Sequence, residues 1–270
     1  MNSISEIFNN SIVDLNRIDG LQSKTEPRCK YIIAITPRSG SSYLCDVMKR
    51  VKRFGVPDEM LNKHFIPGIM KKIPGRTPEE YLRNVTCSRK SKNGLSGLKV
   101  SWFQFNEFFQ AMSDHSYLKD FKYIYLTRRD LGAQAVSLYK ATASSVFHTN
   151  VKNSEDALRK LETLEYNFAE INYWHEHIVV QERGWQKYFY DNRIFPLCLT
   201  YEEIEEDIRQ VLLRIATYIG VKPENIVIPE EESIFTKVRD IRNVEWAFQF
   251  ARDRSSQVDA LPPNGFMLQR

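Results

Sequence analysis

The apolar run YIIAI at residues 31–35 constrains the fold of this chain more than any other segment. A continuous run rich in β-branched residues, without polar alternation, is typical of a strand that is buried on both faces of a parallel sheet. The run leads directly into the loop TPRSGSS at residues 36–42, and apolar residues at helical spacing follow that loop. The sequence therefore predicts a strand, a Ser/Gly loop and a helix in immediate succession.

Three more strand-like segments follow, at residues 97–102, 122–127 and 194–200, and helical patterns separate them. Strands that alternate with helices are typical of an α/β fold with a central parallel sheet covered by helices on both faces. The helical patterns include a long one at residues 154–190. We expect a single domain over residues 29–255, preceded by an arm or short helix at 1–28 and followed by a tail at 256–270.

Residues 63–97 differ from the rest of the chain, because they combine proline and glycine with many lysines and arginines. This composition predicts a mobile excursion with a short helix near residues 78–84. Two interpretations stay open: part of a lid over the substrate, or a solvated surface loop.

The composition bounds the class of protein. The chain has 270 residues, of which 42% are hydrophobic and 27% charged, as in soluble globular proteins, and the net charge of +4 is too weak to predict nucleic-acid binding. The four cysteines form no close pair, which argues against a CxxC metal site and a disulfide framework. Without a secretory pattern or a long apolar run, we expect a cytoplasmic protein that is not integral to a membrane.

The loop at residues 36–42 has the features of a phosphate cradle. Gly40 permits a tight backbone path, and the amides of Ser39, Gly40, Ser41 and Ser42 would meet an anion at the start of the next helix. Pro37 and Arg38 precede them, and Arg38 adds a positive charge. The lysine of an ATP-type loop is missing, because Ser41 stands in its place. A loop of this kind can still hold one phosphate and a sulfate-like group without a metal.

A second candidate anion site follows the predicted strand at residues 122–127. Arg128, Arg129 and Asp130 come directly after that strand, and Ser137 lies on the helix that follows. An arginine at a strand end and a serine on the next helix can bind one phosphate together. Alternatively, Asp130 caps the helix and the arginines lie on the surface.

Together, the two segments resemble the nucleotide-binding signatures of sulfotransferases that use 3′-phosphoadenosine 5′-phosphosulfate (PAPS). The resemblance narrows to the bacterial Stf0-like family, which includes trehalose 2-sulfotransferases. It rests on segments in the right order over about residues 30–220: PRSGSSYLCDVM, GVPDEMLN, GLKVSW, YLTRRDLGAQAVSLYKA and YNFAEINYWHEHIVVQERGWQKYFYDNRIFPLCLTYEEI. It implies a sulfotransferase fold related to the P-loop nucleotide kinases, PAPS as donor with 3′,5′-ADP as product, a sugar-like hydroxyl as acceptor, and possible homodimers.

The resemblance also implies roles for single residues. The loop would bind the 5′-phosphosulfate end, with Arg38 stabilising the leaving phosphate, and Arg129 with Ser137 would bind the 3′-phosphate. Glu59 matches the family's proposed base, while Asp58 and His148 remain rivals for that role. Lys99 and Trp102 are further candidates for substrate contact, although Trp102 also suits a buried core.

Two other functions remain possible at the level of the sequence. A kinase or NTPase of the P-loop type would bind Mg-ATP, and a non-catalytic nucleotide-binding protein would keep the fold without the chemistry. The acceptor itself is not encoded in a readable motif, so trehalose is one choice among saccharides, lipid-linked sugars and small natural products.

Overall fold

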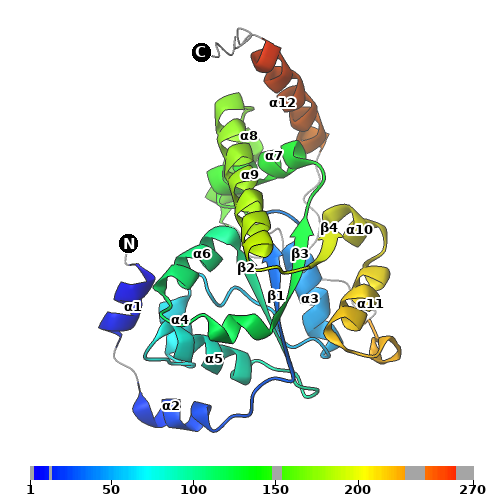
Figure 1. The fold of residues 1–270 in the computed structure, drawn as a ribbon. Helices are drawn as coiled ribbons and strands as arrows, with labels where there is room; N and C mark the ends of the chain where they lie inside the picture. The colour runs from blue at the N-terminus through cyan, green and yellow to red at the C-terminus, as the bar shows by residue number, and fades with distance from the viewer. Residues whose placement is uncertain (1–2, 12–13, 148–153, 229–240, 260–270) are drawn as a thin grey trace, which may run out of the picture. The chain divides into compact units, whose positions relative to one another are not determined.

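In the computed structural model, which describes residues 3–11, 14–147, 154–228 and 241–259, four parallel strands form one sheet. They are β1 (Cys29–Ile35), β2 (Leu95–Ser101), β3 (Phe121–Thr127) and β4 (Leu197–Thr200), in the spatial order β2-β1-β3-β4 (Figure 1). Ile35 pairs with Ser101 on one side and Leu126 on the other, so three strands end level with one another. The predicted α/β fold with a central parallel sheet is confirmed.

Packing divides the described chain into two compact units. The first contains the residues up to Arg129 and the segment that begins at Val180, and therefore the whole sheet. The second contains Asp130–Val179 and the helix α12 (Ile241–Asp259). The sequence predicted one domain over residues 29–255. The division arises because α7 (Leu131–Ser144) buries its apolar face in a core of its own, with side chains of α12 and of α9 (Phe168–Asp191).

Both faces of the sheet in the first unit are covered. Ile32 and Ala34 point into a core formed with α1 (Ile4–Asn10), α4 (Ile66–Met70), α5 (Pro78–Ser88), α6 (Trp102–Ala111) and the C-terminal part of α9. Ile33 and Ile35 point into the opposite core, with α3 (Ser41–Val51), α10 (Tyr201–Glu206) and α11 (Ile208–Ile219). Figure 1 shows α4, α5 and α6 on one side of the sheet and α3 and α11 on the other. Because alternate side chains of β1 point into two different apolar cores, the strand at residues 31–35 is apolar throughout.

Residues 63–97 contain more regular structure than the sequence predicted. They hold α4, α5 and the first residues of β2, and Tyr81, Leu82 and Val85 of α5 are buried in the core. The hydroxyl of Thr77 caps α5 by accepting from the amide of Glu80, and Pro78 occupies the first turn, where a proline does not break a helix. Pro78 therefore marks the start of a helix and does not interrupt one.

Two other helix predictions need correction. The N-terminal segment, expected as an arm or one short helix, forms α1 and α2 (Leu15–Gln22), capped by Ser3 and Asp14. The pattern at residues 154–190 forms α8 (Glu155–Thr163) and α9 as separate helices. A new start at α9 is stabilised by Asn167, whose side chain accepts from the amide of Glu170. Short 3₁₀ turns at Ser116–Asp120 and Pro223–Asn225 complete the described elements.

The second unit has its own apolar core. Val136 and Tyr139 of α7 pack with Ile171 of α9 and with Trp246 and Phe250 of α12. Asp130 caps α7, since its carboxylate accepts from the amide of Ala133 at 2.8 Å. Within the described residues, none of the helices has the length and apolar character that crossing a membrane requires.

Candidate active site

The loop that follows β1 has the backbone geometry of a cradle at a helix start. Arg38 and Gly40 both have positive φ angles, of 66° and 81°, and α3 begins at the next residue, Ser41. Gly40 occupies the N-cap position and has no side chain with which to cap the first amides of α3. Such a helix N-terminus attracts anions through its amides and its dipole. The predicted succession of strand, loop and helix is confirmed.

Tyr201, the first residue of α10, lies against this loop. A Cβ atom at Gly40 would lie 2.7 Å from Cδ2 of the Tyr201 ring, so only glycine fits here without a shift. The guanidinium of Arg128 lies over the same Tyr201 ring, with its Cζ atom 4.5 Å from the ring centroid. No role for Tyr201 was predicted from the sequence. The only feature that could have pointed to it is its position directly after the strand β4.

Two arginines come together at the ends of β1 and β3. Burial first, and the nearby charge of Arg128 second, lower the pKa of Arg38. Beside them, the hydroxyl of Ser39 is fully buried, and within the described residues neither this hydroxyl nor Nε of Arg128 has a hydrogen-bond partner. Adjacent guanidinium groups and an unsatisfied hydroxyl at a helix start fit a phosphate or sulfate group.

Lys99 connects the loop to the candidate base. Its Nζ lies 2.8 Å from Oε1 of Glu59 and donates to Oγ of Ser42 at 3.4 Å. A backbone bridge sets this arrangement, because the amide of Lys99 donates to the carbonyl of Asp58 at 3.0 Å and so aligns residues 58–59 with β2. The carboxylate of Glu59 therefore lies beside the Ser/Gly loop.

The charges of Glu59 and Lys99 stabilise each other. Burial raises the pKa of Glu59, but the charge and hydrogen bond of Lys99, with hydrogen bonds from Gln104 and Asn62, outweigh it and leave that pKa below its ordinary value. Burial lowers the pKa of Lys99, but Cys45 and Glu59 reverse this and raise it. At neutral pH Glu59 is thus an ionised carboxylate that is able to accept a proton.

Asp58, the rival to Glu59, has other partners. Its carboxylate pairs with Nζ of Lys49 and with Nη2 of Arg89, both at 3.2 Å. Two cations therefore hold Asp58, and neither of them is a group of the loop at residues 36–42.

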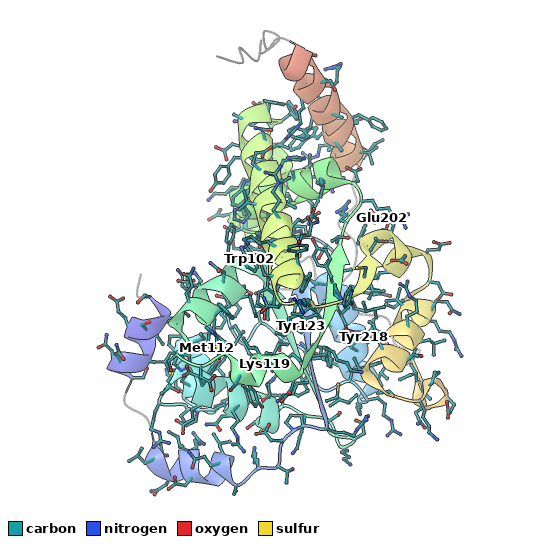
Figure 2. All side chains as sticks on the ribbon, in the orientation of Figure 1. Trp102, Met112, Lys119, Tyr123, Glu202 and Tyr218 are labelled. Atoms are coloured by element: carbon teal, nitrogen blue, oxygen red, sulfur yellow. The ribbon has the colours of Figure 1, made fainter. Side chains whose placement is uncertain are left out.

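Trp102 follows β2 directly and belongs to an aromatic cluster at the carboxyl edge of the sheet (Figure 2). Its ring centroid lies 5.4 Å from that of Trp185, whose Nε1 donates to the carbonyl of Ile35 at 3.1 Å. A Cβ atom at Gly184 would lie 2.2 Å from Nε1 of Trp102, so α9 approaches the start of α6 closely. Trp102 thereby helps to fix α9 over the ends of β1 and β2.

The predicted second anion site is divided between the two units. The side chain of Arg129 is exposed in the first unit, and its backbone amide donates to the carboxylate of Glu202, at the start of α10 (Figure 2). Ser137 lies on α7 in the second unit, so joint binding of a 3′-phosphate by this pair stays a prediction. His148 lies outside the described residues. Within the part of the chain that is described, three or more His, Cys, Asp or Glu side chains do not gather into a possible metal site.

Known proteins match this chain over most of its length. The family model described as Stf0 sulphotransferase matches residues 30–253. The trehalose 2-sulfotransferase of Mycolicibacterium smegmatis is 22% identical over an alignment that covers 86% of this chain and 97% of that protein. The trehalose 2-sulfotransferase of Mycobacterium tuberculosis is 21% identical, with 82% of this chain and 93% of that protein covered.

Solved structures of sulfotransferases are also similar to this chain. One from Alicyclobacillus acidocaldarius is 14% identical with a TM-score of 0.44, and the match covers 84% of this chain and 93% of that one. The mouse sulfotransferase SULT7A1, complexed with PAP, is 15% identical with a TM-score of 0.37, and the match covers 93% of this chain and 74% of that one.

Proposed function

The chain belongs to the Stf0 sulphotransferase family and is a sulfotransferase, and we propose that it uses PAPS to sulfate a hydroxyl of a carbohydrate-like acceptor, with Glu59 as the general base. One observation carries the proposal for the site. Lys99 contacts both Glu59 and Ser42, so a carboxylate that can take a proton lies beside a loop that fits a phosphate or sulfate group.

The residues of the loop fit the 5′-phosphosulfate of PAPS. Arg38 and Arg128 supply positive charge, and the buried hydroxyl of Ser39 has a hydrogen bond to donate. The backbone amides at the start of α3 follow directly in the same loop. When bound, PAPS supplies a sulfuryl group on a phosphate leaving group. We assign its 3′-phosphate to Arg129 and Ser137, as the family resemblance implies.

The acceptor hydroxyl reacts in line with the leaving phosphate. Its oxygen forms a bond to sulfur while the bond between sulfur and the 5′-phosphate oxygen breaks, and the hydroxyl proton passes to the carboxylate of Glu59. Arg38 offsets the negative charge that develops on the departing phosphate. Lys99 keeps Glu59 ionised and holds it toward Ser42.

A saccharide is the acceptor class that we propose. The two curated relatives are named trehalose 2-sulfotransferases, and the alignments cover nearly all of each. A disaccharide such as trehalose is therefore the first acceptor to test. Their low identity to this chain leaves room for a different sugar, because loops that bind acceptors vary most between homologues.

The test is direct transfer by the purified protein. With PAPS and trehalose, glucose, maltose or sucrose, we expect equal amounts of 3′,5′-ADP and a sulfated sugar, measured by chromatography and mass spectrometry. We also expect 3′,5′-ADP to bind in the presence of EDTA, measured by calorimetry. Turnover of Mg-ATP in place of PAPS would favour the kinase, and binding of 3′,5′-ADP without any transfer would favour the non-catalytic alternative.

A further inference from the structure

Helix α9 places one polar side chain, that of Gln181, just beyond the carboxyl edge of the sheet. The helix runs antiparallel to the strands, since the ring of Phe189 lies 5.4 Å from that of Tyr125 in β3 and Trp185 donates to Ile35 at the end of β1. Gln181 precedes Trp185 by four residues and shares its face of the helix. One helical turn, about 5.4 Å, therefore carries Gln181 past the end of β1, where the loop at residues 36–42 begins.

Gln181 is chemically unsatisfied in this position. Its side chain is 1% exposed, and within the described residues neither its Nε2 nor its Oε1 has a hydrogen-bond partner. A buried amide without partners destabilises a fold, and a methionine of similar size would avoid that penalty. A polar ligand that donates one hydrogen bond and accepts another would satisfy both atoms.

Glu182 adds a second unsatisfied group beside Gln181. Its Oε1 is buried without a partner among the described residues, and burial raises the pKa of its carboxyl group. Burial first, and the nearby carboxylate of Glu182 second, raise the pKa of Tyr125 as well. Two consecutive residues of α9 thus carry unsatisfied polar groups, and the carboxyl group of Glu182 lies near the phenol of Tyr125.

These groups border the proposed reaction centre. The carboxylate of Glu59 accepts from Nε2 of Gln104 on α6, at 3.1 Å. The same helix begins at Trp102, which contacts Gly184 and Trp185 on α9. The proposed base and the turn of α9 that follows Gln181 therefore both flank the first turn of α6, at the same edge of the sheet.

We propose that Gln181, together with Glu182, binds hydroxyl groups of the acceptor and determines which saccharide is sulfated. Neighbouring sugar hydroxyls each donate and accept one hydrogen bond, as the two amide atoms require. A carboxyl group next to the amide accepts from a third hydroxyl. This inference rests on the proposed function, because it assigns the acceptor to the site that contains Glu59.

The experiment compares Gln181→Met with Gln210→Met, which makes the same change at an exposed position of α11 on the other face of the sheet. The acceptor is whichever of trehalose, glucose, maltose and sucrose the wild-type protein sulfates fastest. We expect Gln181→Met to raise the KM for that sugar about tenfold or more, the factor that one lost hydrogen bond to a buried group produces. The KM for PAPS and the Kd for 3′,5′-ADP should stay within about twofold in both variants.

Thermal unfolding of the free protein gives a readout without turnover. Gln181→Met should unfold at the same temperature as the wild-type protein or higher, because it removes an amide that has no partner until the acceptor binds. A lower unfolding temperature together with an unchanged KM for the sugar would show that the amide holds a structural water, and would overturn the inference. Equal weakening of 3′,5′-ADP binding would place Gln181 in the donor site and overturn it too.

Deoxy sugars identify the hydroxyl concerned. For the wild-type protein, the monodeoxy analogue that lacks the bound hydroxyl should have a KM about tenfold above that of the parent sugar, and for Gln181→Met this difference should disappear. If the KM of every deoxy analogue rose by the same factor in both proteins, Gln181 would not contact the sugar.

If the wild-type protein sulfated none of the four saccharides, the acceptor class of the proposed function would fail first, and this inference with it. Transfer with an unchanged KM in Gln181→Met would reject this inference alone.

Discussion

The ammonium group of Lys99 lies 2.8 Å from the carboxylate of Glu59 and also donates to the hydroxyl of Ser42, at 3.4 Å. Lys99 is 7% exposed, so solvent screens this ion pair only weakly. One cation thereby links the candidate base to the loop that we propose holds the donor. The pair fixes both the position and the ionisation of Glu59, and these are separable properties.

Replacing Lys99 by methionine should move the acidic limb of the pH profile of kcat/KM to higher pH. Lys99 holds the pKa of Glu59 below its ordinary value against the opposing effect of burial, and without Lys99 burial dominates and the pKa rises. Glu59 is then protonated over more of the acidic range and cannot act as a base there. We also expect kcat at pH 7 to fall about 10- to 100-fold. Initial rates measured from about pH 3.5 to about pH 9, a range that begins below the ordinary pKa of a glutamate, check this.

Two variants serve as controls for this profile. Lys99→Arg keeps the charge and should keep the acidic limb near its original position. Lys49→Met removes a cation that pairs with Asp58 instead, and it should leave the limb unchanged. An acidic limb that stays in place in Lys99→Met would show that Glu59 does not govern it.

Glu59→Gln should lower turnover without weakening the donor site. The amide keeps the size of the side chain but cannot accept the hydroxyl proton, and loss of a general base lowers kcat by about 10²- to 10⁴-fold. The Kd for 3′,5′-ADP should change little, because the phosphate-binding groups at residues 38–42 are intact. Steady-state rates and calorimetry on the same sample separate the two effects.

The matched substitution is Asp58→Asn, one residue away. Asp58 is held by Lys49 and Arg89, so its loss should reduce stability slightly and leave kcat within about tenfold of the wild-type value. Turnover that survives in Glu59→Gln and disappears in Asp58→Asn would exchange the roles that we assign to the two residues.

The sequence was sufficient for features that depend on local pattern. The strand β1, the loop after it and α3 were predicted together, because a buried strand, a glycine that turns the chain and an amphipathic helix each leave a local pattern. Lys99 was predicted only as a candidate for substrate contact. Its ion pair with Glu59 depends on the backbone bridge between Asp58 and Leu98, which no local pattern records.

Other features depend on packing between distant segments. Tyr201 rests on Gly40 because β4 ends beside the loop, which requires the strand order of the sheet. Gln181 resembles a surface residue of an amphipathic helix in the sequence, and only the packing of α9 across the strand ends buries it. The start of α5 was predicted at its proline, which stands in the first turn, but the helix predicted near residues 78–84 stops before the last turn of α5, at residues 85–88.

The assignment of the 3′-phosphate to Arg129 and Ser137 predicts a difference between two ligands. Arg129→Ala and Ser137→Ala should each weaken binding of 3′,5′-ADP about tenfold or more, as expected for a lost bond to a charged group, but should leave the weaker binding of 5′-AMP unchanged. Arg38→Ala should weaken the binding of both nucleotides and nearly abolish transfer, because Arg38 belongs to the proposed 5′-phosphate site. Calorimetry with both nucleotides measures the difference.

Arg209→Ala, at an exposed position of α11, controls for the change in net charge and should affect neither ligand. If Arg129→Ala weakened 3′,5′-ADP and 5′-AMP equally, Arg129 would act on the nucleotide as a whole and the assignment of its 3′-phosphate would be withdrawn.

Gly40→Ala tests the contact between the loop and Tyr201. The added methyl group would lie 2.7 Å from the ring, and the φ angle of 81° is unfavourable for alanine, so the loop and Tyr201 must shift apart. We expect affinity for 3′,5′-ADP to fall about tenfold or more and the unfolding temperature to drop by about 4 °C or less, the shift that about 1 kcal/mol produces in a chain of this length. Gly68→Ala, in α4 with open space around its Cβ position, should bind 3′,5′-ADP as the wild-type protein does. Unaltered nucleotide affinity in Gly40→Ala would mean that the donor binds elsewhere.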